Sequence, residues 1–354
     1  MTEFNLAGKV QTVTGPIDPG NLGFTLTHEH MLVDQSPFTP APPQAGARHI
    51  HSQPVSMENI GYIRHHYFRS ADNGQVWDID TAIEEVSLYK QLGGDSLIDV
   101  TSLGVGRDPV GLARISRATG VNIVMGGSYY QKLVHPPEMD DLTEDDLVAR
   151  IAADIAEGVD GTRVKTGVIG EVGCGWPLSG NERKAVRASS RAQRATGAPL
   201  LIHPGRDESA PSEILDELDD VGADMDHTVM GHIERTLFLS ATLKEVAERG
   251  CYINWDLVGT ESSYYGSYKV KSMPNDAAKM DQMTWLIAEG YGDRILIAQD
   301  LANRSRLMRY GGHGLCYLPS QIVPRMRSRG FTEEDIDRIL VRNPGRAFTF
   351  TEPR

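Results

Sequence analysis

Short runs of aliphatic and β-branched residues recur along the chain, each followed by a loop and then by a segment with helical periodicity. Eight of these runs have the length and composition of buried strands. They are 24–28, 96–101, 122–125, 167–172, 199–203, 228–232, 251–255 and 294–300. Strands that alternate with helices are joined by crossover connections, so the eight strands are expected to be parallel.

The segments between these runs carry apolar residues at the spacing of an α-helix. Leu147, Ile151 and Ile155 share one face of such a segment. Thr143 is suited to cap its start and Gly158 to end it. A similar pattern begins after residue 80. Eight strand–helix units predict an α/β fold, a (β/α)8 TIM barrel. A doubly wound open sheet is the alternative, which the number of strands disfavours.

Two connections are much longer than the others. Residues 33–80, which contain five prolines, separate the first strand from the first helix. Residues 257–276 follow the seventh strand and contain Tyr264, Tyr265 and Tyr268. Long loops at these positions commonly cover an active site or form an interface. No linker divides the chain, so residues 1–354 are expected to form one barrel domain, with 33–80 as a loop insertion.

Composition and charge narrow the class of partner. Of 354 residues, 40% are hydrophobic and 23% are charged, as in ordinary globular proteins. The 35 basic and 48 acidic residues give a net charge of −13, which argues against nucleic acid or an anionic membrane as the main partner. No apolar run approaches the ~18 residues of a membrane span, and the N-terminus lacks the pattern of a signal peptide. The three cysteines fit a reducing compartment, so we expect a cytoplasmic protein.

The most informative motif lies at the end of the first predicted strand, where His28 and His30 are separated by one residue. Residues i and i+2 of a strand point to the same side, so both imidazoles can bind one metal ion. His49 and His51 have the same spacing but lie in the proline-rich loop, without a strand to orient them. We therefore do not expect this second pair to bind metal.

Four other predicted strands also end in a residue that can bind metal. These residues are Glu171, His203, His232 and Asp300. In a parallel barrel the C-terminal ends of all strands meet on one face, where barrel enzymes have their active sites. One such residue alone is more often a hydrogen-bonded core residue or a helix cap. Together with the two histidines of the first strand, they predict a site for two metal ions.

This ordered set of residues resembles the amidohydrolase superfamily, specifically the phosphotriesterase family, over nearly the whole chain. The narrower resemblance is to the phosphotriesterase-related branch, whose animal members are known as N-acetyltaurine hydrolases. Three long motifs carry that resemblance. They are Gly-Val-Ile-Gly-Glu-Val-Gly-Cys at 167–174, Ile-His-Pro-Gly-Arg at 202–206 and Arg-Leu-Met-Arg-Tyr-Gly-Gly-His-Gly at 306–314.

The resemblance implies two divalent metal ions per chain and a hydroxide that bridges them. The implied ligands are His28, His30 and Asp300 for the more buried ion, His203 and His232 for the more exposed ion, and Glu171 between the two. Zinc is the expected metal, although manganese, cobalt or iron would suit the same ligands. Asp300 would also act as the catalytic general acid–base, passing a proton from the hydroxide to the leaving group.

The bridging ligand differs from that of the organophosphate-degrading branch, which uses a carboxylated lysine at the end of the fourth strand. Here that strand ends in Glu171, as in the phosphotriesterase-related branch, and its carboxylate can bridge directly. The rival, Lys165, precedes it by roughly 20 Å of extended chain, at ~3.3 Å per residue. We therefore expect Lys165 to be structural.

Substrate specificity is expected to come from the loops around the metal site. Arg206, three residues after His203, could bind a sulfonate or carboxylate tail. The alternative is an ion pair with Asp207 or Glu208. Tyr129 and Tyr130 could hydrogen-bond a polarised oxygen or simply pack in the wall. Weaker candidates follow the eighth strand, namely Arg304, Arg306 and His313.

The resemblance implies a metal-dependent hydrolase that uses the bridging hydroxide to cleave the amide of small N-acyl compounds. N-acetyltaurine and N-acetyl amino acids are the expected substrates. The alternative is a lactonase or carboxylesterase with promiscuous phosphotriesterase (organophosphate) activity, which would use the same metals. A binding protein without turnover would be expected to lack a ligand, and none of the six is missing. Homodimers are common in this family, and either long loop could contribute to an interface.

Overall fold

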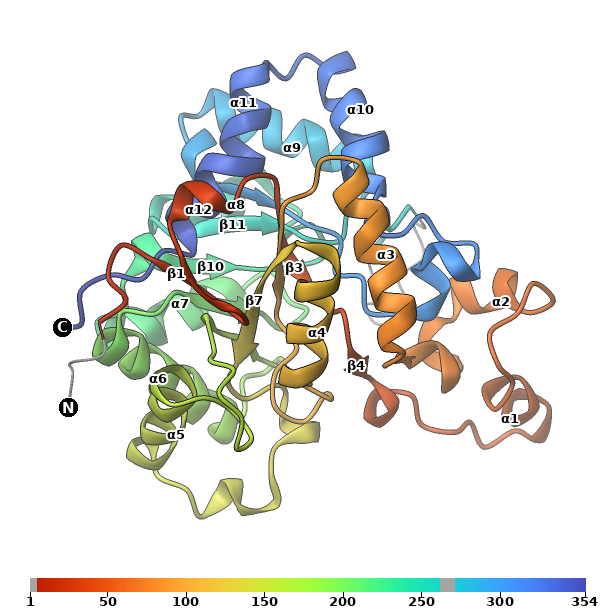
Figure 1. Cartoon of the computed structure of the whole chain (residues 1–354), viewed down its shortest axis with the longest axis horizontal. Helices are drawn as coiled ribbons and strands as arrows, with labels where there is room; N and C mark the ends of the chain where they lie inside the picture. Colours follow the sequence, from red (N-terminus) through yellow and green to blue (C-terminus); the bar gives the residue numbers. More distant parts are fainter. Residues whose placement is uncertain (1–4, 262–270) are drawn as a thin grey trace.

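The computed structural model describes residues 5–261 and 271–354. Eight parallel strands form its central sheet, and helices surround them (Figure 1). In sheet order the strands are β12 (Ile295–Ile297), β11 (Tyr252–Trp255), β10 (Thr228–Met230), β9 (Leu200–His203), β8 (Val168–Gly173), β7 (Asn122–Gly127), β6 (Ser96–Asp99) and β3 (Thr25–Glu29). Each predicted strand run overlaps one of them, and β3, β7 and β8 extend one or two residues beyond the predicted ends.

The first and last barrel strands, β3 and β12, lie side by side and nearly close the sheet. The Thr27 hydroxyl donates to the Ile297 carbonyl at 3.1 Å, and the Asp300 amide donates to the His28 carbonyl at 3.0 Å. These bonds link residues near the two ends of the chain. The sheet is therefore a nearly closed barrel, as predicted, and not an open doubly wound sheet.

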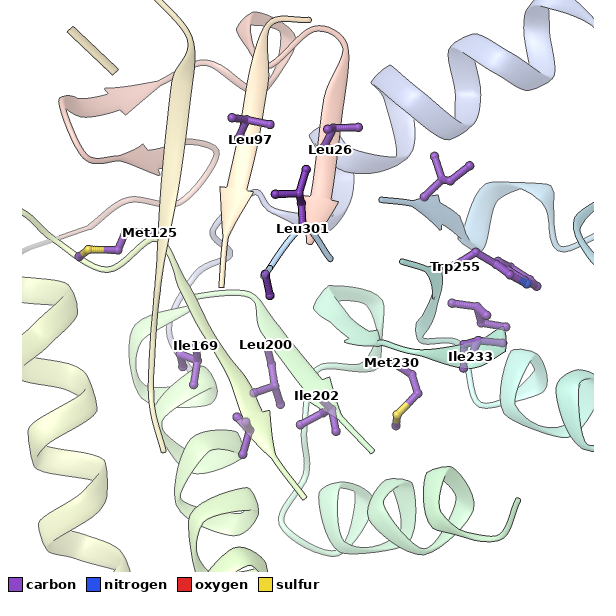
Figure 2. Packing of buried hydrophobic residues seen from close by; sticks show 14 of the residues in the cluster. Leu26, Leu97, Met125, Ile169, Leu200, Ile202, Met230, Ile233, Trp255 and Leu301 are labelled. Carbon is purple, nitrogen blue, oxygen red and sulfur yellow. The ribbon is translucent and has the colours of Figure 1, made fainter. Parts of the chain in front are cut away.

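Alternate strand residues are buried on opposite sides of the sheet, as the two-residue period of a strand requires. Ile98, Leu201 and other residues form one cluster inside the barrel. Leu97 and Leu200, their sequence neighbours, belong to a larger cluster that packs against the helices (Figure 2). Most strand residues are thus apolar on both faces, although a few buried polar side chains lie within the sheet, such as Thr27 of β3, which donates to Asn254 of β11.

The main helices cover the outside of the barrel. They are α3 (Ile79–Gln91), α4 (Pro109–Thr119), α5 (Glu144–Ala156), α6 (Gly180–Thr196), α7 (Ala210–Asp220), α8 (Ser240–Glu248) and α9 (Asp276–Ala288). The C-terminal part adds α10 (Val323–Ser328), α11 (Glu333–Asp337) and α12 (Asn343–Ala347). Helix α5 has the predicted cap, since the Thr143 side chain accepts from the Asp146 amide. Its buried residues are the predicted Leu147, Ile151 and Ile155.

The long loop after β3 is more structured than its prolines suggest. It contains β4 (Val33–Asp34), α1 (Ala45–His51), α2 (Ile60–His65) and β5 (Gln75–Val76). Strands β4 and β5 pair antiparallel, so the two ends of the loop are held together, and α1 and α2 extend to one side of the barrel (Figure 1). The loop therefore forms a defined projection beside the barrel.

At the other end of the barrel, β1 (Val10–Thr12) and β2 (Gly15–Ile17) form a hairpin. Val10 belongs to the apolar cluster inside the barrel, so the hairpin closes the N-terminal end. The tyrosines predicted to matter in the second long loop, Tyr264, Tyr265 and Tyr268, lie outside the described residues. Within the described ranges, no helix has the length and apolar character needed to cross a membrane.

Candidate metal centre

All six predicted ligands lie together at the C-terminal ends of the barrel strands. They are His28 and His30 at β3, Glu171 in β8, His203 at the end of β9, His232 shortly after β10 and Asp300 shortly after β12. Five of the six are buried, and the Asp300 side chain is 21% exposed. The carboxylate with the greatest access to solvent is thus Asp300, and it faces a cavity of about 620 Å³ above the cluster.

Glu171 is the centre of this cluster, and each of its carboxylate oxygens faces an imidazole. Its Oε1 lies 3.4 Å from His30 Nε2. Its Oε2 lies 2.7 Å from His203 Nδ1 and 3.4 Å from the Nε2 atoms of both His28 and His232. Four imidazoles that come from three strands therefore converge on one carboxylate.

Asp300 approaches the same cluster from the other side of the barrel seam. Its Oδ1 lies 3.2 Å from His30 Nε2 and 4.0 Å from His28 Nε2. Two groups of three residues have ligand atoms within 4.8 Å of one another: His28 with Glu171 and His232, and His28 with His30 and Asp300. The two groups share His28, so they are adjacent.

Asp256, which directly follows β11, orients two of these imidazoles. Its Oδ1 accepts from His232 Nδ1 at 2.7 Å, and its Oδ2 lies 3.1 Å from His28 Nδ1. The same carboxylate accepts from the His232 backbone amide at 2.9 Å, where the backbone is left-handed with φ 54°. A carboxylate that holds Nδ1 leaves Nε2 available to a metal. Sequence reasoning missed Asp256, although it too lies at a strand end.

Charge compensation governs protonation in the cluster. Burial alone would raise the pKa of Glu171, but the charges of His203 and His28 hold it well below its usual range. Burial opposes protonation of His28, but Asp256 and Glu171 raise its pKa well above the usual range. For His30, burial is again outweighed, and hydrogen bonds to the carboxylates of Asp300 and Glu171 raise its pKa to about 10. Protons therefore supply positive charge that a metal could supply instead.

The donor atoms fit a divalent metal ion. His28 Nε2 is buried and has no hydrogen-bond partner, although it is directed at Glu171. His203 Nδ1 and His232 Nε2 lie only 2.8 Å apart, at the same carboxylate oxygen. Neutral imidazole nitrogens and carboxylate oxygens are the ligands that zinc prefers alongside thiolate. The described residues thus include a candidate metal-ligand cluster.

The two predicted tyrosines are separated by the structure. Tyr130 lines the cavity, and its hydroxyl lies 3.3 Å from His203 Nδ1. Tyr129 is buried and does not line the cavity; its ring lies at the edge of His135 instead. Adjacent residues at a strand end point in opposite directions, which is why only one of the two faces the site. Of the two roles left open, packing in the wall therefore fits Tyr129, and contact with the cavity fits Tyr130.

Arg206 and His313 both line the cavity. The two acids considered as ion-pair partners of Arg206 accept other hydrogen bonds. Asp207 accepts from the backbone amide of Ser209, and Glu208 accepts from the backbone amide of Phe238. Burial and the nearby charge of Arg306 lower the pKa of His313 to about 4. His313 is therefore neutral at pH 7 and cannot supply a positive charge to the cavity.

Several residues of the cavity wall were not predicted from the sequence. Arg235 lies in the 3-10 turn η8 (Ile233–Arg235) after β10, and its buried Nη2 is 3.1 Å from His203 Nε2. The long loop after β3 contributes Arg64, Tyr67 and Phe68, among others. This loop therefore covers one side of the cavity, in the way that long loops at this position do.

The residues judged unsuitable from sequence lie away from the cluster. His49 and His51 lie on α1, where they contact Gln53 and the Arg69 carbonyl, respectively. Lys165 lines a separate, smaller cavity beside the β1–β2 hairpin, at the N-terminal end of the barrel. Neither the second histidine pair nor this lysine contributes to the candidate metal centre.

Comparison of the sequence with known proteins finds relatives that match nearly the whole chain. A model of the phosphotriesterase family matches residues 8–348. A phosphotriesterase-related protein of Nematostella vectensis is 42% identical over 347 residues, covering 97% of this chain and 99% of that protein. The N-acetyltaurine hydrolase of Homo sapiens is 40% identical over 348 residues, covering 98% of this chain and 99% of that protein.

Comparison of the structure points in the same direction. A resiniferatoxin-binding protein from Rhodobacter sphaeroides superposes with a TM-score of 0.93 at 34% identity, covering 97% of this chain and 96% of that one. A lactonase from Listeria monocytogenes superposes with a TM-score of 0.78 at 25% identity, covering 97% of this chain and all of that one. Both matches extend over nearly the whole barrel.

Metal uptake by the metal-free protein should release protons. The pKa of His30 is raised to about 10, so its Nε2 carries a proton at every lower pH, and a metal must displace that proton. Affinity for zinc should therefore rise with pH between 6 and 9, by about tenfold per unit for each proton released. Calorimetric titration in two buffers with different ionisation enthalpies counts these protons. A zinc affinity that does not change over this pH range would contradict the prediction.

Proposed function

We propose a substrate class for this chain, which belongs to the phosphotriesterase family and is a hydrolase. The substrates are small N-acyl compounds with an anionic tail, such as N-acetyltaurine or N-acetyl amino acids. The observation that carries the proposal is a buried histidine–carboxylate cluster at the floor of a cavity whose wall presents guanidinium groups. Relatives that are named N-acetyltaurine hydrolase and match over nearly their full length support it.

We propose that the cluster holds two divalent metal ions, with zinc the expected ion. His28, His30 and Asp300 would hold one ion, His203 and His232 the other, and Glu171 would lie between them. When bound, two such ions lower the pKa of a shared water towards neutrality and polarise a carbonyl oxygen. Glu171 suits the bridging role because its two oxygens face different imidazoles, Oε1 towards His30 and Oε2 towards His203.

Asp300 is the residue that we propose for proton transfer. Its side chain is the only one of the six that is appreciably exposed, so it can reach both the cluster and a substrate in the cavity. Burial alone would raise its pKa, but the hydrogen bond from His30 and the charge of His232 keep the pKa below the usual value. An ionised carboxylate at this place can take a proton and return it to the leaving amine nitrogen.

Tyr130 is suited to bind the acyl oxygen. Burial raises the pKa of Tyr130 well above its usual value, and Glu171 and Asp300 raise it further. The hydroxyl therefore stays protonated and can donate a hydrogen bond next to His203, where negative charge would develop on the carbonyl oxygen.

The guanidinium groups of Arg206 and Arg235 are proposed to bind the anionic tail. Both line the cavity, and Arg235 is buried with its Nη2 3.1 Å from His203 Nε2. A planar guanidinium offers two parallel donors to a sulfonate or carboxylate. A bound N-acyl compound would then have its scissile amide at the cluster and its tail at these arginines.

Lactone or ester hydrolysis is the second candidate function. The similarity to a lactonase from Listeria monocytogenes favours it. The same cluster would serve both reactions, because each needs an activated water and a polarised carbonyl. The cavity wall, which contains positively charged arginines, favours anionic amides over neutral lactones.

Zinc-reconstituted protein should release acetate from N-acetyltaurine and contain about two zinc ions per chain. Metal content and acetate are measured on the same sample. Removal of zinc by a chelator should abolish release, and zinc should restore it. His203→Ala should lose at least about 100-fold in rate, since general acid–base and metal-ligand roles are each of this order. Two zinc ions without acetate release would reject N-acetyltaurine as the substrate and leave another N-acyl compound or a lactone.

Arg206→Gln should raise the KM for N-acetyltaurine about 10–100-fold with little change in kcat. Hydrogen bonds to charged groups contribute ~1.5–3 kcal/mol, and ~1.4 kcal/mol corresponds to a factor of ten. The neutral analogue, in which a hydroxyl replaces the sulfonate, should be unaffected. Arg114→Gln, which removes a guanidinium from an exposed ion pair with Asp80, is the matched control. Equal losses on the charged and neutral substrates would exclude Arg206 as the anion contact.

A further inference from the structure

The backbone at Asp300 has an unusual conformation for a residue with a side chain. Its φ is 48°, in the left-handed region. Glycine adopts this region freely and asparagine and aspartate do so occasionally, whereas other residues seldom do. The backbone conformation sets the direction of the carboxylate. Asp300 lies three residues after the end of β12 and outside any regular element. Something other than secondary structure must therefore hold this turn.

Glu29 holds the turn from one side. It lies between His28 and His30 in β3, so its side chain points to the opposite face of the strand. The side chain is fully buried, its Oε1 accepts from the Gln299 amide at 2.7 Å, and its Oε2 accepts from the Leu301 amide at 3.0 Å. The two oxygens of one carboxylate therefore bind the amides on either side of Asp300.

Arg306 holds the carbonyl groups of the same turn. Its Nη1 donates to the Gln299 carbonyl at 2.6 Å and to the Asp300 carbonyl at 2.8 Å, and its Nη2 donates to the Val258 carbonyl at 3.0 Å. The Asp300 amide donates to the His28 carbonyl at 3.0 Å. Every backbone polar group from the amide of residue 299 to the amide of residue 301 is thus bonded.

The residue after Asp300 adds an apolar anchor. Leu301 is buried in the same hydrophobic cluster as Leu26 of β3, and Figure 2 labels both. The turn is consequently fixed by polar contacts at its backbone and by packing at one side chain, while the Asp300 carboxylate alone is directed towards the cluster.

We propose that Glu29 and Arg306 are positioning residues that hold Asp300 in its left-handed conformation, so that its carboxylate meets His30 at the edge of the cavity. The inference rests on the proposed function, in which Asp300 is a metal ligand. Neither residue is itself a ligand. Their effect on the metal passes through the backbone of the turn.

The geometry also explains why glutamate occupies the position between the two histidines. Only a carboxylate with two acceptor oxygens can bind both flanking amides. Glutamine would place an NH₂ group against a backbone N–H, and two donors cannot bond to each other. Aspartate is one methylene shorter and would not span the same two amides without moving β3.

Glu29→Gln is therefore the variant that tests the proposal, with zinc affinity as the measurement. Competition with a chromophoric chelator should show zinc binding weakened about 10–100-fold, the range found when outer-shell partners of metal ligands are replaced. Glu182→Gln is the matched control. Glu182 is also buried, and it accepts from the backbone amides of Lys132 and Gly175 at 3.1 and 3.0 Å, away from Asp300. It should lower the melting temperature but leave zinc affinity unchanged.

A second background separates positioning from general loss of structure. In an Asp300→Asn chain, Glu29→Gln should change zinc affinity less than twofold, because the carboxylate that it positions is already absent. Arg306→Lys should likewise weaken zinc binding in the natural chain but not in the Asp300→Asn chain. It replaces Glu29→Gln as the test variant if Glu29→Gln does not fold.

Two results would overturn the proposal without affecting the proposed function. They are zinc binding that is as tight in Glu29→Gln and Arg306→Lys as in the natural chain, or equal weakening in both backgrounds. A natural chain that takes up no divalent metal would overturn the proposed function and this inference together.

Discussion

A buried carboxylate needs compensating charge, and the burial of Glu171 is the constraint on which the rest of this site depends. Moving an ion out of water costs several kcal/mol even after the protein relaxes, so an isolated carboxylate at this position would not stay ionised. Here four imidazoles face its two oxygens. Those imidazoles are held in turn by other polar groups, of which Asp256 binds both His28 and His232. The site is therefore a network in which each charged group requires the next.

The barrel makes this network possible. Residues 28 and 300 are far apart in sequence, yet the closing seam between β3 and β12 brings them within hydrogen-bonding distance. Most strand residues are apolar on both faces, and the six candidate ligands collect near the C-terminal ends of the strands. That separation lets one end of the barrel carry chemistry, while the other end, closed by the β1–β2 hairpin, supports the fold.

Much of this arrangement could be predicted from sequence because strand ends are visible in the hydrophobic pattern. Each of the six predicted ligands follows an apolar run, so parallel strands were enough to place them on one face. Asp256 was missed although the same rule applies to it, since β11 ends just before it. The contacts of Arg235 and Arg306 depend on short turns after the strands, whose geometry has no periodic signature. The roles of Tyr129 and Tyr130 could not be separated from sequence, because the direction of a side chain at a strand end depends on the last residue of the strand.

The position of metal ions in crystals of the zinc-loaded protein would test the central claim most directly. Diffraction data collected on both sides of the zinc absorption edge locate the ions without any assumption about activity. The account predicts two anomalous peaks, one beside His30 and Asp300 and one beside His203 and His232, with Glu171 between them. A single peak, or zinc bound away from Glu171, would contradict it.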